Sequence, residues 1–264
     1  MLTTRAVPAL VAVLASAGAA AQQPAAHTDC DGGWYRNSSH HVCEVREVTV
    51  RAAKALSVDA GTNGGIRVSG TDRKDVLVRA TVHAWGGDED AARAIAGQVV
   101  VRTDDIIRAE GPEQHGRDGW AVNYEVLTPR ETNLDLRSNN GGVAIANVRG
   151  DLHFATLNGG IALDGVAGDV SGRTTNGPVD VKLTGRQWEG QTLDVSTTNG
   201  PVSVRIPENY SARLEAGTVQ GPMHVDFPMV LKGNIGRSIS TTLGKGGALV
   251  RAQTTNGPVS VSKY

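Results

Sequence analysis

The chain has 264 residues, of which 33 are glycine, 2 Phe, 4 Tyr and 4 Trp. Glycine is therefore one residue in eight, against a usual share of about 7%, but the glycines keep no three-residue period, which excludes collagen. A hydrophobic content of 39% and a formal net charge of −1 exclude a disordered chain. The same charge gives no indication of a nucleic acid or an anionic membrane as a partner.

Residues 1–21 have the features of a secretory signal. Arg5 precedes an apolar stretch over residues 6–20, and Ala19-Ala20-Ala21 forms a small-residue cleavage site. The stretch is too short to span a bilayer. We expect residues 22–264 to be exported to the periplasm, the cell surface or the medium, with no transmembrane segment.

The two cysteines, Cys30 and Cys43, lie thirteen positions apart. In an oxidising compartment they are expected to form a disulfide, which contributes roughly 3 kcal/mol by restricting the unfolded chain. The alternative is a metal site that adds the nearby side chains of His40, His41, Asp29 and Asp31. Zinc motifs pair cysteines two to four residues apart, so the disulfide is favoured.

Upstream of residue 130 the pattern predicts several strands and one helix. Strands are expected at 45–51, 76–85, 98–103 and 120–127, and Asn63-Gly64-Gly65 resembles a bulged or distant copy of the repeat described below. Residues 88–96 read as a helix, with Asp88 as the N-cap and Gly97 as the end. We predict that the strand at 45–51, the disulfide loop and this helix cover one end of the fold.

The second half contains a repeat. Each copy has an amide-glycine corner with a hydroxyl residue two positions before it, and alternating apolar residues on both sides. Each copy is therefore two short strands joined at a corner where glycine is expected to supply a positive φ. The corner amides belong to Asn140, Asn158, Asn176, Asn199, Gln220 and Asn256.

The spacings between successive amides are 18, 18, 23, 21 and 36 residues. Because 36 is twice 18, the last interval suggests a degenerate copy or an excursion over 229–247, which leaves the register between Gln220 and Asn256 open. A regular period near 20 indicates stacked units that contact their neighbours.

Proline decides between two architectures. Asn-Gly between strands favours a hairpin, but four copies have Pro directly after the glycine, where a hairpin needs an N–H donor. The corner is better explained as a bend in a single-chain parallel β-solenoid of 18–23-residue coils. The corner amides share parity with the apolar residues, so we expect them to point inward as a ladder, beside a row of Ser and Thr that bonds from coil to coil. The prolines are Pro178, Pro201, Pro222 and Pro258.

These motifs resemble a family of exported bacterial proteins with a DUF4097-type domain that are labelled as candidate adhesins. The resemblance rests on the Thr-Asn-Gly corners, on Gly244-Lys245-Gly246-Gly247-Ala248 before the last corner, and on Cys43-Glu44-Val45-Arg46-Glu47. It covers most of residues 30–264 and is strongest after Asn133. It implies an all-β solenoid and supplies no catalytic residues. We expect a signal peptide at 1–21, a disulfide-stapled segment at 22–54 and a solenoid domain at 55–264, most regular over 133–264.

Motifs for catalysis are weak in this sequence. Gly244-Lys245-Gly246 lacks the spacing of a phosphate loop, and His83, His153 and His224 are expected at the solvated surface. The pairs Asp88/Asp90 and Asp104/Asp105 fit a helix start and a turn better than an acid–base pair. Burial is favoured over sugar stacking for the large aromatic residues Trp34, Tyr35, Trp85, Trp120 and Trp188. We therefore predict no catalytic, cofactor-binding or metal-binding residues.

Three functions remain open. The favoured one is a non-enzymatic solenoid at the cell envelope that presents its repeat surface to a protein or a glycan. The second is a polysaccharide-acting β-helix enzyme, for which Lys182, Arg186 and Arg205 give a weak indication. The third is a periplasmic assembly or stress factor that binds another envelope protein.

Overall fold

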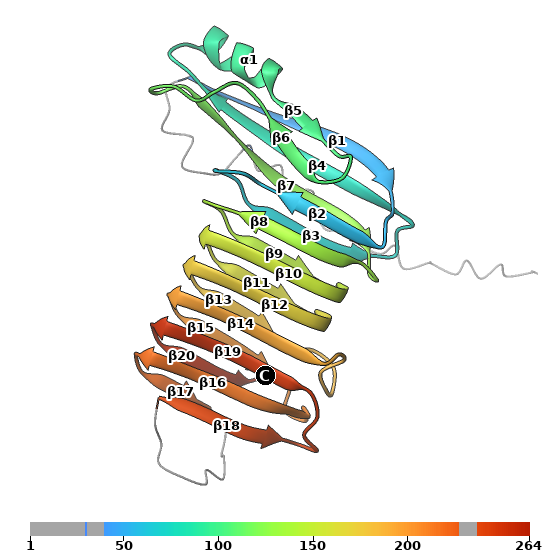
Figure 1. The fold of residues 1–264 in the computed structure, drawn as a ribbon, viewed down its shortest axis with the longest axis vertical. Coiled ribbons are helices and arrows are strands. Elements are labelled where there is room, and N and C mark those ends of the chain that lie inside the picture. Colours follow the sequence, from blue (N-terminus) through green and yellow to red (C-terminus); the bar gives the residue numbers. More distant parts are fainter. Residues whose placement is uncertain (1–29, 31–39, 227–236) are drawn as a thin grey trace, which may run out of the picture.

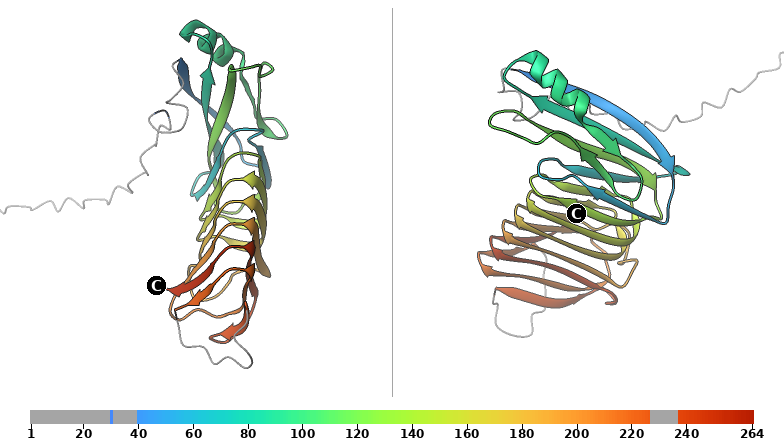
Figure 2. Two further views of the ribbon diagram at one scale, coloured as in Figure 1. Left: turned by 90° about the vertical axis from the view of Figure 1, so that its left-hand side faces the viewer. Right: turned by 45° about the horizontal axis from the view of Figure 1, so that its top comes forward.

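The computed structural model describes Cys30 and residues 40–226 and 237–264. The signal predicted at 1–21, Trp34 and Tyr35, and part of the excursion predicted at 229–247 lie outside these residues. The described chain forms two long sheets that face each other along one stack (Figures 1 and 2). It is mostly β with one short helix, as predicted.

Sheet A has ten strands and begins with three antiparallel neighbours before the parallel pairing starts. Its order is β1 (His41–Arg51), β4 (Asp75–Trp85), β7 (Gly119–Pro129), β3 (Ile66–Thr71), β9 (Val143–Ala146), β11 (Ile161–Asp164), β13 (Val179–Lys182), β15 (Val202–Ile206), β20 (Val259–Lys263) and β17 (Met223–Val225).

Sheet B also has ten strands, and its central strands are all parallel. Its order is β18 (Ser238–Leu243), β16 (Ala212–Gln220), β19 (Leu249–Asn256), β14 (Thr192–Asn199), β12 (Ala167–Asn176), β10 (Arg149–Asn158), β8 (Asn133–Ser138), β2 (Ala55–Asp59), β6 (Ile107–Glu110) and β5 (Val100–Arg102).

Each coil contributes one strand to each sheet, and the corner between them bends without forming a hairpin. In β12, for example, Thr174 pairs in parallel with Thr156 of β10 and with Thr197 of β14. Apolar side chains alternate with outward polar ones and meet between the two sheets, where Leu152 and Val195 are fully buried. The parallel β-solenoid is therefore confirmed. At the four corners that contain proline, the missing N–H is a local reason why no hairpin closes.

The N-terminal end is a different layer. β1 is the edge strand of sheet A, and the helix α1 (Glu89–Gln98) packs against β4 and β1 at the top of Figure 1. Asp88 caps the helix by accepting a hydrogen bond of 2.7 Å from the amide of Ala91. The predicted end at Gly97 is wrong, because the helix continues to Gln98. There the amide of Val99 bonds to the carbonyl of Ala96.

The predicted amide ladder forms, but it faces outward. The Nδ2 atom of Asn176 donates to Oδ1 of Asn158 at 2.8 Å, and the chain of bonds continues through the coils. The prediction that these amides point inward is wrong because the strand bends after the hydroxyl residue, which breaks the alternation. We call these residues, all exposed except the half-buried Asn63, the amide ladder: Asn63, Asn140, Asn158, Asn176, Asn199 and Asn256.

The hydroxyls occupy the inner position that was predicted for the amides. Thr174, which is 3% exposed, donates through Oγ1 to the carbonyl of Gly159 in the preceding coil at 2.8 Å. This close approach also explains the corner glycines, because a Cβ on Gly177 would overlap the carbonyl of Gly159. Positive φ was the predicted reason, and it holds only at Gly221 and Gly257. We call the hydroxyl set the hydroxyl row: Ser138, Thr156, Thr174, Thr197, Thr218 and Thr254.

The interval of 36 residues has a topological cause. β18 turns back antiparallel to β16, and the chain then inserts β19 between β14 and β16, and β20 between β15 and β17. The last coil in sequence is therefore the second to last in space. Of the two predicted alternatives, a degenerate copy or an excursion over 229–247, the structure bears out the excursion, because β18 lies in that range and returns antiparallel to β16.

Cys30 and Cys43 form a disulfide, as predicted, so neither thiol is left for a metal. His83, on the neighbouring strand, is buried with 1% exposure, and the expectation of a solvated residue is wrong for it. Its Nδ1 lies 3.1 Å from Nε2 of His41, and Asn123 is also in contact. His153 and His224 are exposed, as predicted. Among the residues that the structure describes, no helix has the length and hydropathy to cross a membrane.

Candidate functional site

A groove of about 440 Å³ lies on the outer face of sheet A, where the antiparallel layer meets the parallel coils. It extends across seven neighbouring strands from β1 to β13. Its floor consists of small residues from three coils, and charged side chains stand at both ends. We call it the glycine groove, and define its floor as Gly65, Gly142, Gly160, Ala144 and Ala162.

Strand register places these residues. Arg67 of β3 pairs with Ala144 of β9, which pairs with Ala162 of β11 and then with Asp180 of β13. On the other side, Arg67 pairs with Glu125 of β7. One row of outward side chains thus crosses the groove from cation to anion over an alanine floor.

The N-terminal end of the groove is held by an ion-pair network. Arg79 lies between two carboxylates, with Nε 2.6 Å from Glu47 and Nη1 3.2 Å from Glu125. The hydrogen bond that Arg79 donates to Glu47 is the main cause that raises the pKa of Arg79. Within the described part of the chain, Arg67 has no carboxylate at ion-pair distance, so its charge is available to a ligand.

The outer face of sheet B carries a second, more polar hollow of about 650 Å³. Its carboxylates are already paired. Asp135 lies 3.1 Å from Arg137, and Asp194 lies 3.3 Å from Arg251, which also binds Glu215 at 2.9 Å. Both carboxylates that line this hollow are thus engaged in ion pairs, so neither is left as an unpaired acid for an acid–base pair.

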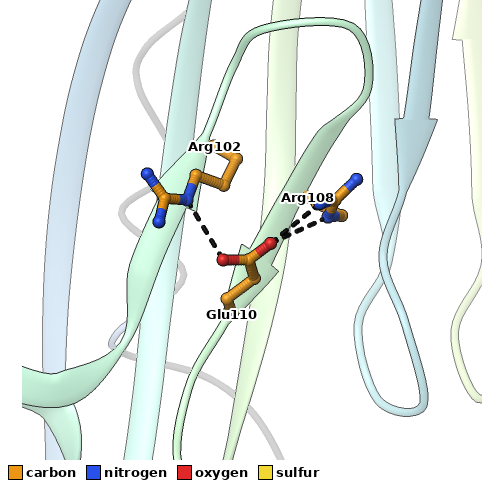
Figure 3. Close-up of polar contacts among 3 residues, drawn as sticks. All are labelled: Arg102, Arg108 and Glu110. Carbon is orange, nitrogen blue, oxygen red and sulfur yellow. Dashed lines mark hydrogen bonds and ion pairs between the residues drawn. The ribbon is translucent and has the colours of Figure 1, made fainter.

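The free edge of sheet B is charged. Glu110 on β6 accepts hydrogen bonds from Arg108 at 2.8 Å and from Arg102 on β5 at 3.1 Å (Figure 3). The bond from Arg108 is the first cause that lowers the pKa of Glu110. Charged side chains on an edge strand oppose pairing with another chain, so we interpret this cluster as edge protection.

The other residues that the sequence singled out have structural places. Asp88 is the helix cap, and Asp104 and Asp105 lie exposed in the bend between β5 and β6. Lys182 pairs with Asp164 at 3.1 Å and lies over the Tyr264 ring. The remaining cations and tryptophans do not converge: Arg186 and Arg205 are exposed, Trp188 is buried, and Trp85 and Trp120 are half-buried.

The sequence motifs do not reveal the groove. The signal was present in the sequence as a difference between copies, because three coils have Asn-Gly-Gly where later coils have Asn-Gly-Pro or Gln-Gly-Pro. Only the register shows that these three coils are neighbours in space.

Two solved structures align with most of this chain at low sequence identity. A candidate cell adhesion protein from Clostridium sporogenes is 12% identical, with a TM-score of 0.49 over 84% of this chain and 100% of that chain. A candidate adhesin from Bacteroides fragilis is 11% identical, with a TM-score of 0.42 over 84% and 97%. No curated protein matches the sequence.

A family model gives the assignment. The model of the Toastrack DUF4097 family matches residues 117–262, which is more than half of the chain and includes every coil from β8 onward. The match spans the corners from Asn140 onward, the amide ladder apart from Asn63, and the inserted C-terminal coil. The chain belongs to the Toastrack DUF4097 family.

Proposed function

We propose that this protein is an exported, non-enzymatic binding protein of the adhesin type, which contacts a protein or a glycan at the cell envelope through the glycine groove. The observation that carries the proposal is the groove itself. It is a concave surface on rigid strands, and it combines a small-residue floor with an available cation at Arg67.

Location outside the cytoplasm is supported by the disulfide between Cys30 and Cys43, because such bonds persist in oxidising compartments. The adhesin descriptions of the similar solved structures agree with a binding role. A polysaccharide-acting enzyme is the weaker alternative, since the carboxylates Asp135, Asp194 and Glu215 on the polar face are engaged in ion pairs.

Site-specific photo-crosslinking tests the proposal. A photoreactive amino acid replaces Ala144 on the groove floor, and the matched control replaces Ala155, a half-buried outward alanine on sheet B. Both variants are produced in cells that make the protein. We expect defined adducts from Ala144 and few from Ala155. Adducts from Ala155 alone, or from neither position, contradict a binding role for the groove.

Adduct identity separates the remaining functions. One defined envelope protein as the adduct supports an assembly factor, whereas glycan adducts or several surface ligands support an adhesin. Turnover of any polysaccharide by the purified chain would overturn the non-enzymatic assignment.

A further inference from the structure

The shape of the glycine groove comes from the residue that follows each corner glycine. This position lies directly before a strand of sheet A. It is occupied by Gly65, Gly142 and Gly160 in three adjacent coils, and by Pro178 in the next one. A proline ring at this position stands on the outer face, and Pro178 forms the wall where the groove ends. The groove is therefore open only where proline is absent.

Glycine in place of proline also adds backbone N–H donors at this position. The amide of Gly65 donates to Oδ1 of Asn123 at 2.8 Å, so a side-chain oxygen lies on the groove surface above this coil. Gly142 and Gly160 occupy the same position in the next two coils. Within the described residues neither of their amides has an acceptor. Asn123 thus marks where an oxygen sits in the first coil, and a ligand can supply the next two oxygens.

The spacing of these donors indicates the kind of ligand. Adjacent coils are about 4.8 Å apart, so the acceptor oxygens must repeat at that interval along the stack. An extended peptide presents carbonyls on one side only every second residue, about 6.8 Å apart. The length of one pyranose unit is close to the spacing between adjacent coils, so successive sugars in a chain can lie opposite successive coils.

Charge narrows the choice further. Arg67 is an available cation beside Gly142 and Ala144. Asp180, in the same outward row and with no ion pair among the described residues, can accept hydrogen bonds from hydroxyl groups. A ligand with both carboxylates and hydroxyls satisfies this set. The ring of Tyr124 is buried with 2% exposure and provides no stacking platform, so recognition is polar.

We propose that the glycine groove binds an acidic glycan of the uronic acid type, along the stack axis. Sugar oxygens accept from the amides of Gly142 and Gly160, and a sugar carboxylate pairs with Arg67. This inference rests on the proposed function in using the same groove, and it specifies the ligand class.

Amide NMR of the intact mature chain tests the site directly. The ¹⁵N-labelled protein is titrated with oligogalacturonate, with the same oligomer methyl-esterified at its carboxylates, and with hexaglutamate. We expect the amide signals of Gly142 and Gly160 to shift with oligogalacturonate, weakly with the ester and little with hexaglutamate. Equal shifts with hexaglutamate overturn the glycan assignment, and no shift at these two amides overturns the site.

Two variants measure how much the Gly160 amide and the Arg67 cation contribute to glycan affinity. Gly160→Pro copies the later coils, so it removes one donor and fills the groove, and we expect affinity to fall about tenfold. Arg67→Gln removes the cation, with an expected loss of about tenfold or more. Arg205→Gln, exposed on the same sheet outside the groove, should leave affinity unchanged. If the Gly160→Pro variant has a lowered melting temperature, the Gly142→Pro variant is used in its place.

These outcomes separate the inference from the function on which it rests. If oligogalacturonate does not bind while the Ala144 crosslinker still captures another ligand, the groove remains the binding site and the acidic glycan is wrong. If the control Arg205→Gln weakens binding as much as Arg67→Gln, the charge effect is general to the surface, and the assignment to Arg67 is wrong.

Discussion

At the residue scale, the hydroxyl row and the amide ladder differ in burial although both link the same coils. The hydroxyl of Thr174 is buried, so the carbonyl of Gly159 has little access to water as an alternative partner. The amide of Asn176 is exposed, and water can replace its bond to Asn158. An unmade hydrogen bond is costly when the group is buried and cheap when it is solvated.

Replacement of Thr174 by Val keeps the shape of the side chain and removes its donor. We expect the free energy of unfolding to fall by about 1–2 kcal/mol because the Gly159 carbonyl is left unpaired. The matched change Thr175→Val, at a half-buried neighbour, should stay within about 0.5 kcal/mol. Urea denaturation measures both, and equal losses would show that the buried donor has no special weight.

The sequence was sufficient to find the corner residues but not their direction. Alternation places Leu152, Phe154 and Thr156 on one side of their strand, and all three are buried. Alternation stops where the backbone bends, which periodicity does not reveal. The reason for Gly172 is also hidden from the sequence. The ring of Phe154 from the adjacent coil fills the space that a Cβ on Gly172 would need.

At the element scale, the coils are nearly interchangeable, and this explains why chain order did not predict spatial order. Val250 of the last coil pairs with Leu193 on one side and with Leu214 on the other. The coil at 212–225 and the coil at 192–206 therefore offer the same register to any neighbour. A repeat pattern predicts which residues can stack, whereas the order of stacking depends on where the connecting segments lead.

Removal of residues 249–264 tests this equivalence. Without the inserted coil, β16 can pair directly with β14, because both use the same register. We expect the shortened chain to remain folded with lower stability. Cysteines replacing Asn199 and Gln220, which both pair with Asn256 in the intact protein, should form a disulfide only after the deletion. Mass spectrometry of the digested protein detects whether the two introduced cysteines are joined by a disulfide.

The intact chain with the same two cysteines is the control, since two coil spacings of about 4.8 Å then separate the positions. A disulfide in the intact chain would contradict the inserted topology. An unfolded shortened chain would show that the neighbouring coils cannot close the gap.

At the scale of the whole molecule, the fold joins an antiparallel layer to a stack of parallel coils. The antiparallel layer of β1, β4 and β7 carries the disulfide and the helix, and the parallel coils continue from β3 to the C-terminal end. In a stack, each unit contacts mainly its neighbours, so stability is close to a sum of local terms. The family resemblance and the repeat were sufficient for the coils. The antiparallel layer was only partly predictable, because its strands pair across long loops.

Loss of the disulfide tests how far a local change travels along the stack. In the variant Cys30→Ser with Cys43→Ser, we expect amide protection in β1 and β4 to fall at least tenfold, since the crosslink contributes roughly 3 kcal/mol to this layer. Protection in β12 and β14 should change less than about twofold because these strands contact only adjacent coils. Hydrogen exchange with mass spectrometry resolves both regions. A uniform loss over all strands would mean that the molecule unfolds as one cooperative unit, with its two kinds of sheet energetically inseparable.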